Sequence, residues 1–146
     1  MARTMKISIA SEQTNVSLVG LAVNRISYHM GFSSQDAHQI EIGVVEAVHN
    51  AIRHSHKNDP SLVVEVILDV FEDYLLIRVR DFGLSMGRLK IPDLDFDPDD
   101  LNNIPESGMG LFIINKIMDD VKYESKDGFN QLVMTKYLHG LPDSGA

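Results

Sequence analysis

The chain has 146 residues, which is the size of one ordinary domain and long enough to bury a hydrophobic core. Its content of 44% hydrophobic and 23% charged residues indicates a globular protein rather than a disordered one. A net charge of −8 without any basic cluster argues against direct binding of nucleic acid. No apolar run approaches the roughly 18 residues that a membrane-spanning helix needs, so we expect no membrane partner.

The amino terminus and the cysteine count bear on the location of the protein. The first ten residues lack the basic region, the long apolar segment and the cleavage site of a signal peptide. The chain also has no cysteine that could form a disulfide. These features predict a cytoplasmic protein whose ligand is a small molecule or another protein.

The first predicted elements are a short edge strand and a helix. Alternating apolar and polar residues predict the strand over Met5 to Ala10. After Ser11, apolar residues recur at three- and four-residue steps, which predicts a helix that ends at Gly31. This helix needs a neighbour that covers its apolar stripe.

A second helix is predicted from Ser34 to about His56, with Ser33 and Asp36 as its capping box. Turn-forming residues around Pro60 end it. Its apolar face consists of Ala37, Ile40, Val44, Ala47, Val48 and Ala51.

Three polar side chains share one stripe of this second helix. At about 100° per residue, Glu46, Asn50 and Arg53 fall on the same side, roughly opposite the centre of the apolar face. A carboxylate, an amide oxygen and a guanidinium therefore point in one direction. A solvated stripe without function has the same pattern, so a chemical role for these residues needs support from elsewhere in the chain.

Four strands are predicted in two hairpins. Ser61 to Phe71 and Tyr74 to Arg80 are rich in β-branched and aromatic residues, and the two residues between them indicate a tight antiparallel turn. Val121 to Ser125 and Phe129 to Leu138 form the second hairpin. The domain therefore spans residues 1–139, and residues 140–146 are expected to be a flexible tail.

A long stretch with little periodicity separates the two hairpins. It follows Asp81 and Gly83, runs to about Ser107, and contains three prolines and five closely spaced aspartates. Loops of this length in compact domains are commonly lids, binding loops or disordered segments. We interpret residues 84–107 as a lid, with a solvated acidic loop as the alternative.

A third helix is predicted directly after this loop. Its amino terminus presents free backbone N–H groups beside two glycines, Gly108 and Gly110, that are small enough to admit a phosphate. The apolar residues at helical spacing are Leu111, Phe112, Ile114, Ile117 and Met118.

Three motifs, each weak alone, now stand in a specific order: Glu46-x-x-x-Asn50, Asp81-x-Gly83 and Gly108-x-Gly110. In this order the sequence resembles the Bergerat-fold ATPases, the superfamily of DNA gyrase, histidine kinases and mismatch-repair ATPases. The stretches EAVHNAI, RDFGLSMG and SGMGLFIINKIMDDV, with TKYL in the last strand, look most like the small anti-sigma-factor serine kinases of bacteria. A histidine kinase normally places a phosphoacceptor helical domain ahead of this module, where this chain has one strand and one helix.

The resemblance implies a two-layer α/β sandwich, with a mixed, largely antiparallel sheet of about five strands and three helices on one face. It implies a single ATP-binding kinase domain that phosphorylates a serine of an anti-anti-sigma partner of the sulfate-transporter-and-antagonist type. It further implies binding of a sigma factor and a homodimer paired through the first helix and the sheet. The alternatives are a nucleotide-dependent sequestering module without phosphotransfer and a detached histidine-kinase catalytic domain.

The resemblance also assigns roles to individual residues. Asn50 is expected to coordinate Mg²⁺, and Glu46 to accept the proton of the attacking hydroxyl. Asp81 is expected to accept a hydrogen bond from the adenine amine, and Gly83 to leave room for the base. The phosphates of ATP are expected at the start of the third helix, at Ser107, Gly108, Met109 and Gly110.

The sequence departs from the family pattern at two places. Ser85 stands where the second motif carries a second glycine, so a side chain is expected to crowd the nucleotide there. The last strand begins with Gly128-Phe129-Asn130 instead of Gly-Thr, so the polar contact of the threonine is either lost or supplied by Asn130.

His49 and His54 have the wrong spacing for a zinc site and no cysteine joins them, so they do not indicate a zinc site.

Overall fold

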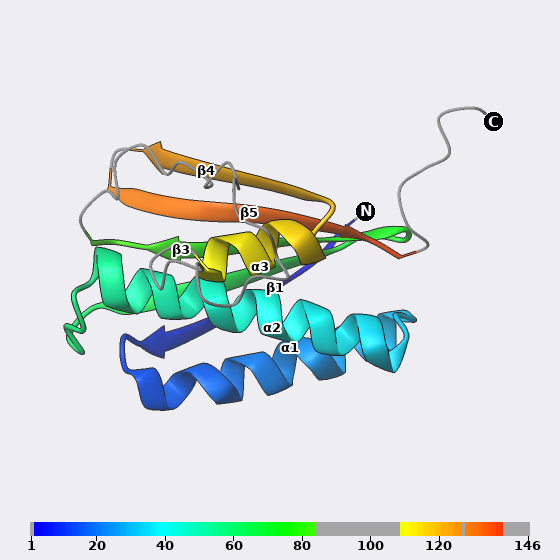
Figure 1. Cartoon of the computed structure of the whole chain (residues 1–146), viewed down its shortest axis with the longest axis horizontal. Helices are drawn as coiled ribbons and strands as arrows, with labels where there is room; N and C mark the ends of the chain where they lie inside the picture. Colours follow the sequence, from blue (N-terminus) through cyan, green and yellow to red (C-terminus); the bar gives the residue numbers. More distant parts are fainter. Residues whose placement is uncertain (1, 84–108, 127, 139–146) are drawn as a thin grey trace, which may run out of the picture.

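The computed structural model describes residues 2–83, 109–126 and 128–138. They form one sheet with helices on one of its faces (Figure 1). The strands are β1 (Arg3–Ala10), β2 (Val63–Val70), β3 (Tyr74–Asp81), β4 (Asp120–Lys126) and β5 (Phe129–Tyr137). The helices are α1 (Val16–Met30), α2 (Ser34–Asn50) and α3 (Met109–Ile117), with a short 3₁₀ helix η1 (Gln13–Asn15) and a π-helical turn η2 (Ala51–Ser55).

The sheet has the strand order β1-β2-β3-β5-β4, so β1 lies at an edge as predicted. All four pairings between the described strands are antiparallel. The prediction of a mixed sheet included parallel pairing, and the described strands contain none. The predicted hairpin between β2 and β3 is confirmed, because the N–H of Phe71 donates to the carbonyl of Tyr74 across the turn at 3.0 Å. The predicted two-layer sandwich of about five strands and three helices is therefore confirmed.

The core lies between the sheet and the helices, because each strand turns alternate residues toward the helices. Along β3, Leu75, Ile77 and Val79 are buried, whereas Arg78 and Arg80 lie on the other face of the sheet. Full burial of an aliphatic side chain stabilises the fold by about 1.5–3 kcal/mol relative to its exposure. The residues of this cluster that come from the helices include Val16, Val19, Val23, Ile40, Val44, Val48, Ile52 and Ile114.

The end of α1 and the start of α2 lie where the sequence predicts. Gly31 ends α1 in the left-handed conformation, at a φ of 116°, which glycine adopts without strain. The side chain of Ser33 caps α2 by accepting a hydrogen bond from the N–H of Asp36 at 3.0 Å. A Cβ atom at Gly20 would lie 2.7 Å from Val45, so the glycine lets these two helices approach closely.

The end of the second predicted helix differs from the prediction. The α-helix stops at Asn50 and continues as the π-helical turn η2, in which the N–H of His56 donates to the carbonyl of Ala51 at 2.9 Å. A π-helical turn inserts an extra residue into the helix and changes the direction of the side chains that follow. The prediction of one continuous α-helix to His56 is therefore wrong over this last turn.

Candidate active site

The first and third motifs meet at Gly110, the second residue of α3. A Cβ atom at Gly110 would lie 2.8 Å from Oε2 of Glu46 and 3.3 Å from Nδ2 of Asn50. Both side chains are half-buried on the side of α2 that packs against α3. The structure thus brings a carboxylate, an amide and the amino-terminal turn of a helix to one place. The alternative of a solvated stripe without function does not fit the half-buried positions of Glu46 and Asn50.

Arg53 does not share the environment of this pair. The rotation of about 100° per residue that placed Arg53 on the stripe holds for an α-helix, and Arg53 lies in the π-helical turn η2. Its side chain is exposed, whereas Glu46 and Asn50 are half-buried.

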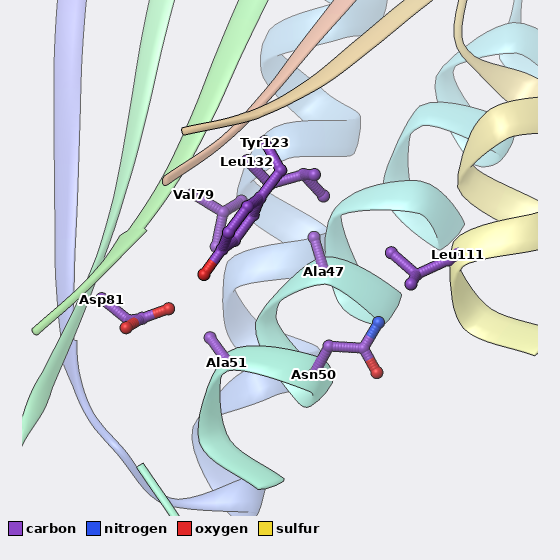
Figure 2. Close-up of a pocket in the computed structure, with 8 residues that line it drawn as sticks. All are labelled: Ala47, Asn50, Ala51, Val79, Asp81, Leu111, Tyr123 and Leu132. Carbon is purple, nitrogen blue, oxygen red and sulfur yellow. The ribbon is translucent and has the colours of Figure 1, made fainter. Parts of the chain in front are cut away.

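A pocket between α2, α3 and the sheet connects this place to the second motif. Figure 2 shows Asp81 on β3 facing Ala51 of α2, whereas the side chain of Asn50 extends from α2 toward the side of Leu111 and α3. Small alanine side chains on the helix leave room above the sheet. Among the described residues, the pocket is lined by Ala47, Asn50, Ala51, Val79, Asp81, Leu111, Tyr123 and Leu132.

Asp81 is buried, and three hydrogen bonds from described residues converge on one of its oxygens. Oδ1 accepts from Oγ of Ser55 at 2.5 Å, from Nδ2 of Asn130 at 2.9 Å and from the N–H of Gly83 at 3.1 Å. The same amide group of Asn130 also donates to the carbonyl of Gly83 at 3.2 Å. Asn130 therefore supplies a polar contact at the start of the last strand, which is one of the two alternatives left open by the sequence.

Gly83 lies tightly against the π-helical turn. A Cβ atom there would sit 2.3 Å from the carbonyl oxygen of Ser55 and 2.6 Å from Cδ2 of His56. Because a backbone oxygen cannot move aside, only glycine fits at this position. The contact between the second motif and η2 is thus one physical reason for a glycine at position 83. The predicted need to leave room for the base is a second reason.

His56 is buried beside Asp81 in a defined tautomer. Its Nε2 accepts the N–H of Phe82 at 3.1 Å, so the proton is on Nδ1, which donates to Oγ of Ser11 at 2.9 Å. Burial lowers the pKa of His56, although the carboxylates of Asp81 and Asp59 act in the opposite direction. The imidazole is therefore neutral near pH 7.

Sequence patterns did not identify Ser55 and His56 as site residues, because an α-helical period does not predict where a π-helical turn directs them. Several predicted residues cannot be placed. Ser107 and Gly108 lie outside the described residues, as do Ser85, the predicted lid over residues 84–107 and the predicted tail. Met109 begins α3.

The donors at Gly110 suit Mg²⁺. The side-chain oxygen of Asn50 is a hard oxygen ligand of the kind that this cation takes, together with oxygens of a triphosphate and water. Within the described ranges, no group of three or more His, Cys, Asp or Glu side chains could hold a metal by itself. No helix in the described part of the chain is long and apolar enough to cross a membrane.

Comparison with known proteins agrees with this geometry. The family model of the histidine kinase-like ATPase domain matches residues 9–136. The serine-protein kinase RsbW of Bacillus velezensis is 32% identical over 145 residues, which cover 93% of this chain and 86% of that protein. RsbW of Bacillus cereus strain Q1 is 30% identical over 138 residues, which cover 92% of this chain and 84% of that protein.

A solved structure has the same fold. The crystal structure of the RsbU and RsbW domains of Rv1364c from Mycobacterium tuberculosis matches 93% of this chain with a TM-score of 0.63 and 17% identity. The match covers 32% of that longer chain, and at this identity it shows the fold alone.

The fold and the three adjoining motifs define an ATPase domain of the histidine kinase-like type, as predicted. The chain belongs to the histidine kinase-like ATPase domain family, and within it to the family of the serine-protein kinases RsbW.

Proposed function

We propose that this chain is a Mg²⁺-ATP-dependent protein-serine kinase that acts as an anti-sigma factor. The observation that carries the proposal is the meeting of Glu46, Asn50 and the amino terminus of α3 at Gly110, with Asp81 across the same pocket. The relatives named as serine-protein kinases RsbW support transfer to a serine.

Asp81 selects the nucleobase. Its Oδ1 is occupied by three donors, so Oδ2 is the oxygen left to accept the amine of adenine. Guanine carries a carbonyl oxygen at the same place, and two acceptors that face each other repel. The site therefore favours ATP over GTP.

Glu46 and Asn50 have different tasks although they are one helical turn apart. Asn50 holds the metal through its side-chain oxygen and thereby serves binding of the triphosphate. Bound Mg²⁺ neutralises charge on the phosphates. Glu46 accepts the proton of the attacking serine hydroxyl, and the backbone N–H groups at the start of α3, including Gly110, hold phosphate oxygens together with Ser107, Gly108 and Met109.

The proposed partners are a sigma factor, an anti-anti-sigma protein of the sulfate-transporter-and-antagonist type as the substrate, and a second copy of this chain. Support for a homodimer comes from an exposed apolar stripe on α1, where Leu18, Leu21 and Tyr28 are 64%, 56% and 53% exposed. A groove of about 590 Å³ lies between this helix and β1, and Met5 and Arg25 are among its lining residues. The net charge of −8 supports a protein that acts in the cytoplasm without nucleic acid or membrane partners.

The alternative function is a module that binds nucleotide and sequesters a partner without phosphotransfer. Two substitutions separate the functions when phosphate transfer from labelled ATP to the partner's serine and the affinity for ATP are measured together. Glu46→Gln removes the base and is expected to slow transfer by about 10²–10⁴-fold while ATP still binds. Asn50→Ala is expected to lose both ATP affinity and transfer.

The controls are Glu72→Gln in the exposed β2–β3 turn and Asn115→Ala on the exposed side of α3. Both are expected to behave like the wild type, because they lie away from the pocket. A wild-type protein that binds ATP and partner but transfers nothing is a sequestering module. Transfer by Glu46→Gln at the wild-type rate would show that another group takes the proton.

A further inference from the structure

The π-helical turn η2 and the residue after it place two side chains against the second motif from one side. Ser55 reaches the carboxylate of Asp81 directly, with Oγ 2.5 Å from Oδ1. His56 reaches the next residue of the motif, because its Nε2 accepts the backbone N–H of Phe82 at 3.1 Å. One contact fixes the side chain of Asp81, and the other fixes the backbone that carries it.

These contacts are anchored on both sides of the motif. His56 is held by the buried hydroxyl of Ser11, which follows β1, and both side chains are almost fully buried. On the far side, Nδ2 of Asn130 from β5 donates to the same oxygen of Asp81 as Ser55 does. The carboxylate of Asp81 is thus held by hydrogen bonds from η2 and from the sheet.

The hydrogen bonds to Asp81 are distributed unequally between its two oxygens, and this matters for recognition of the base. All three donors among the described residues bind Oδ1, so a rotation of the carboxylate would break these bonds at once. Oδ2 therefore keeps one direction relative to the pocket that Asp81 lines. A fixed acceptor rejects a guanine carbonyl, whereas a carboxylate that can turn away tolerates it.

We propose that Ser55 and His56 are positioning residues that set the preference of this site for adenine over guanine nucleotides. The proposal rests on the proposed function, because it takes Asp81 as the group that reads the base. Neither residue is among the described residues that line the pocket. Ser55 fixes the orientation of the Asp81 carboxylate, and so the direction from which it accepts a hydrogen bond, whereas His56 fixes the backbone at Phe82 next to Asp81.

The test measures dissociation constants for ADP and GDP by isothermal titration calorimetry. Ser55→Ala removes the donor to Oδ1, and His56→Phe keeps a planar ring but removes the acceptor for Phe82. Ser55→Ala is expected to lower the preference for ADP over GDP by about tenfold or more, in line with the loss of a hydrogen bond to a charged group, and His56→Phe, which loses a bond between neutral groups, by about two- to tenfold. His56→Gln retains an acceptor and is expected to restore much of the preference.

Ser27→Ala is the matched control. Ser27 is also fully buried, and its Oγ donates to the carbonyl of Val23 at 2.7 Å within α1, away from the pocket. Its loss is expected to lower the melting temperature without changing the ratio of the two dissociation constants. This control separates a loss of stability from a loss of selectivity.

The pH profile gives a second readout. Protonation of His56 at Nε2 would convert the acceptor for Phe82 into a donor next to Asp81, whose Oδ1 lies 4.0 Å away. The charged groups that face the ring are Asp81 from β3 and Asp59 from the segment after η2. Affinity for ADP is expected to fall as the pH drops through the lowered pKa of His56, and to fall more steeply in the wild type than in His56→Gln, since the titration of the nucleotide itself is common to both.

The outcomes separate the two levels of the argument. If the wild type prefers ADP and Ser55→Ala keeps that preference unchanged, the positioning role is refuted while the proposed function stands. Ser55→Ala decides this even where His56→Phe does not fold. If the wild type binds neither nucleotide, or both equally, Asp81 does not read the base and the proposed function fails as well.

Discussion

Substitution of Gly110 by alanine is expected to damage phosphotransfer without damaging the fold. The added Cβ would lie 2.8 Å from Oε2 of Glu46 and 3.3 Å from Nδ2 of Asn50. Non-bonded heavy atoms prefer separations of about 3.5 Å or more, so the carboxylate must retreat by roughly 0.7 Å. The atom that moves is the far end of a flexible side chain, so the backbone of α3 can stay in place.

The expected magnitudes follow from this geometry. Alanine in a helix is favoured over glycine by up to about 1 kcal/mol, and a displaced rotamer of Glu46 costs about 0.5–1.5 kcal/mol. The two terms nearly cancel, so the free energy of unfolding is expected to change by less than about 1 kcal/mol. A misplacement of 1 Å near the reacting groups can cost about 10²-fold in rate, so transfer is expected to fall by about 10- to 100-fold.

The control is Gly43→Ala on α2. Its Cβ would lie 2.7 Å from Cε of Met118, which is likewise the far end of a flexible side chain, and among the described residues it would meet no side-chain atom of Glu46 or Asn50 within 4 Å. Urea unfolding and transfer from labelled ATP to the partner's serine are measured for both variants. Transfer by Gly110→Ala at the wild-type rate, or an equal loss in Gly43→Ala, would refute the role given to the meeting of the first and third motifs.

Three further predictions concern the second motif, the surface and the dependence on pH. Gly83→Ala is expected to lower the free energy of unfolding by about 1–3 kcal/mol, since the added Cβ meets the carbonyl oxygen of Ser55 at 2.3 Å; an unchanged urea midpoint would contradict this contact. Leu21→Lys is expected to convert a dimer into a monomer in sedimentation velocity without changing the melting temperature, and a dimeric variant would contradict the proposed interface. The folded state keeps His56 neutral because burial lowers its pKa, so the unfolded chain takes up the proton first as the pH falls below 6.5. The free energy of unfolding is then expected to fall by up to about 1.4 kcal/mol per pH unit until the lowered pKa is reached, and His56→Gln is expected to lack this contribution.

The sheet and the first two helices could be predicted from the sequence because their signals are local. Alternation along β3 matches its burial, since one face of the strand packs on the helices and the other does not. Gly31 and the pair Ser33 and Asp36 mark helix ends through backbone conformation and capping, which need no knowledge of the rest of the fold. Such features are determined within a few residues and so appear in the pattern.

The interior of the site depends on contacts between segments that are distant in the sequence. Fewer of its details could therefore be predicted from the sequence. The order of the three motifs predicted that Glu46, Asn50 and Gly110 belong together, but only the packing of α3 on α2 shows that Gly110 is a glycine because two side chains fill its space. Ser55 carried no signal at all. Its hydrogen bond to Asp81 spans 26 residues and requires a π-helical turn, and the burial of Ala51 and Ile52 is compatible with either kind of helix.

The π-helical turn also gives a physical reason for the spacing of the second motif. Asp81 must end a strand so that its carboxylate enters the pocket, and the chain two residues later must pass the carbonyl of Ser55 at a distance that excludes a Cβ. The same two residues are joined by a hydrogen bond, in which the N–H of Gly83 donates to Oδ1 of Asp81 at 3.1 Å. The glycine of this pair allows close packing against η2, and the aspartate places its carboxylate in the pocket, where we propose that it recognises the base. Because η2 directly follows Asn50 and carries Ser55, which donates to Asp81, this turn connects the proposed metal ligand to the carboxylate that we propose reads the base.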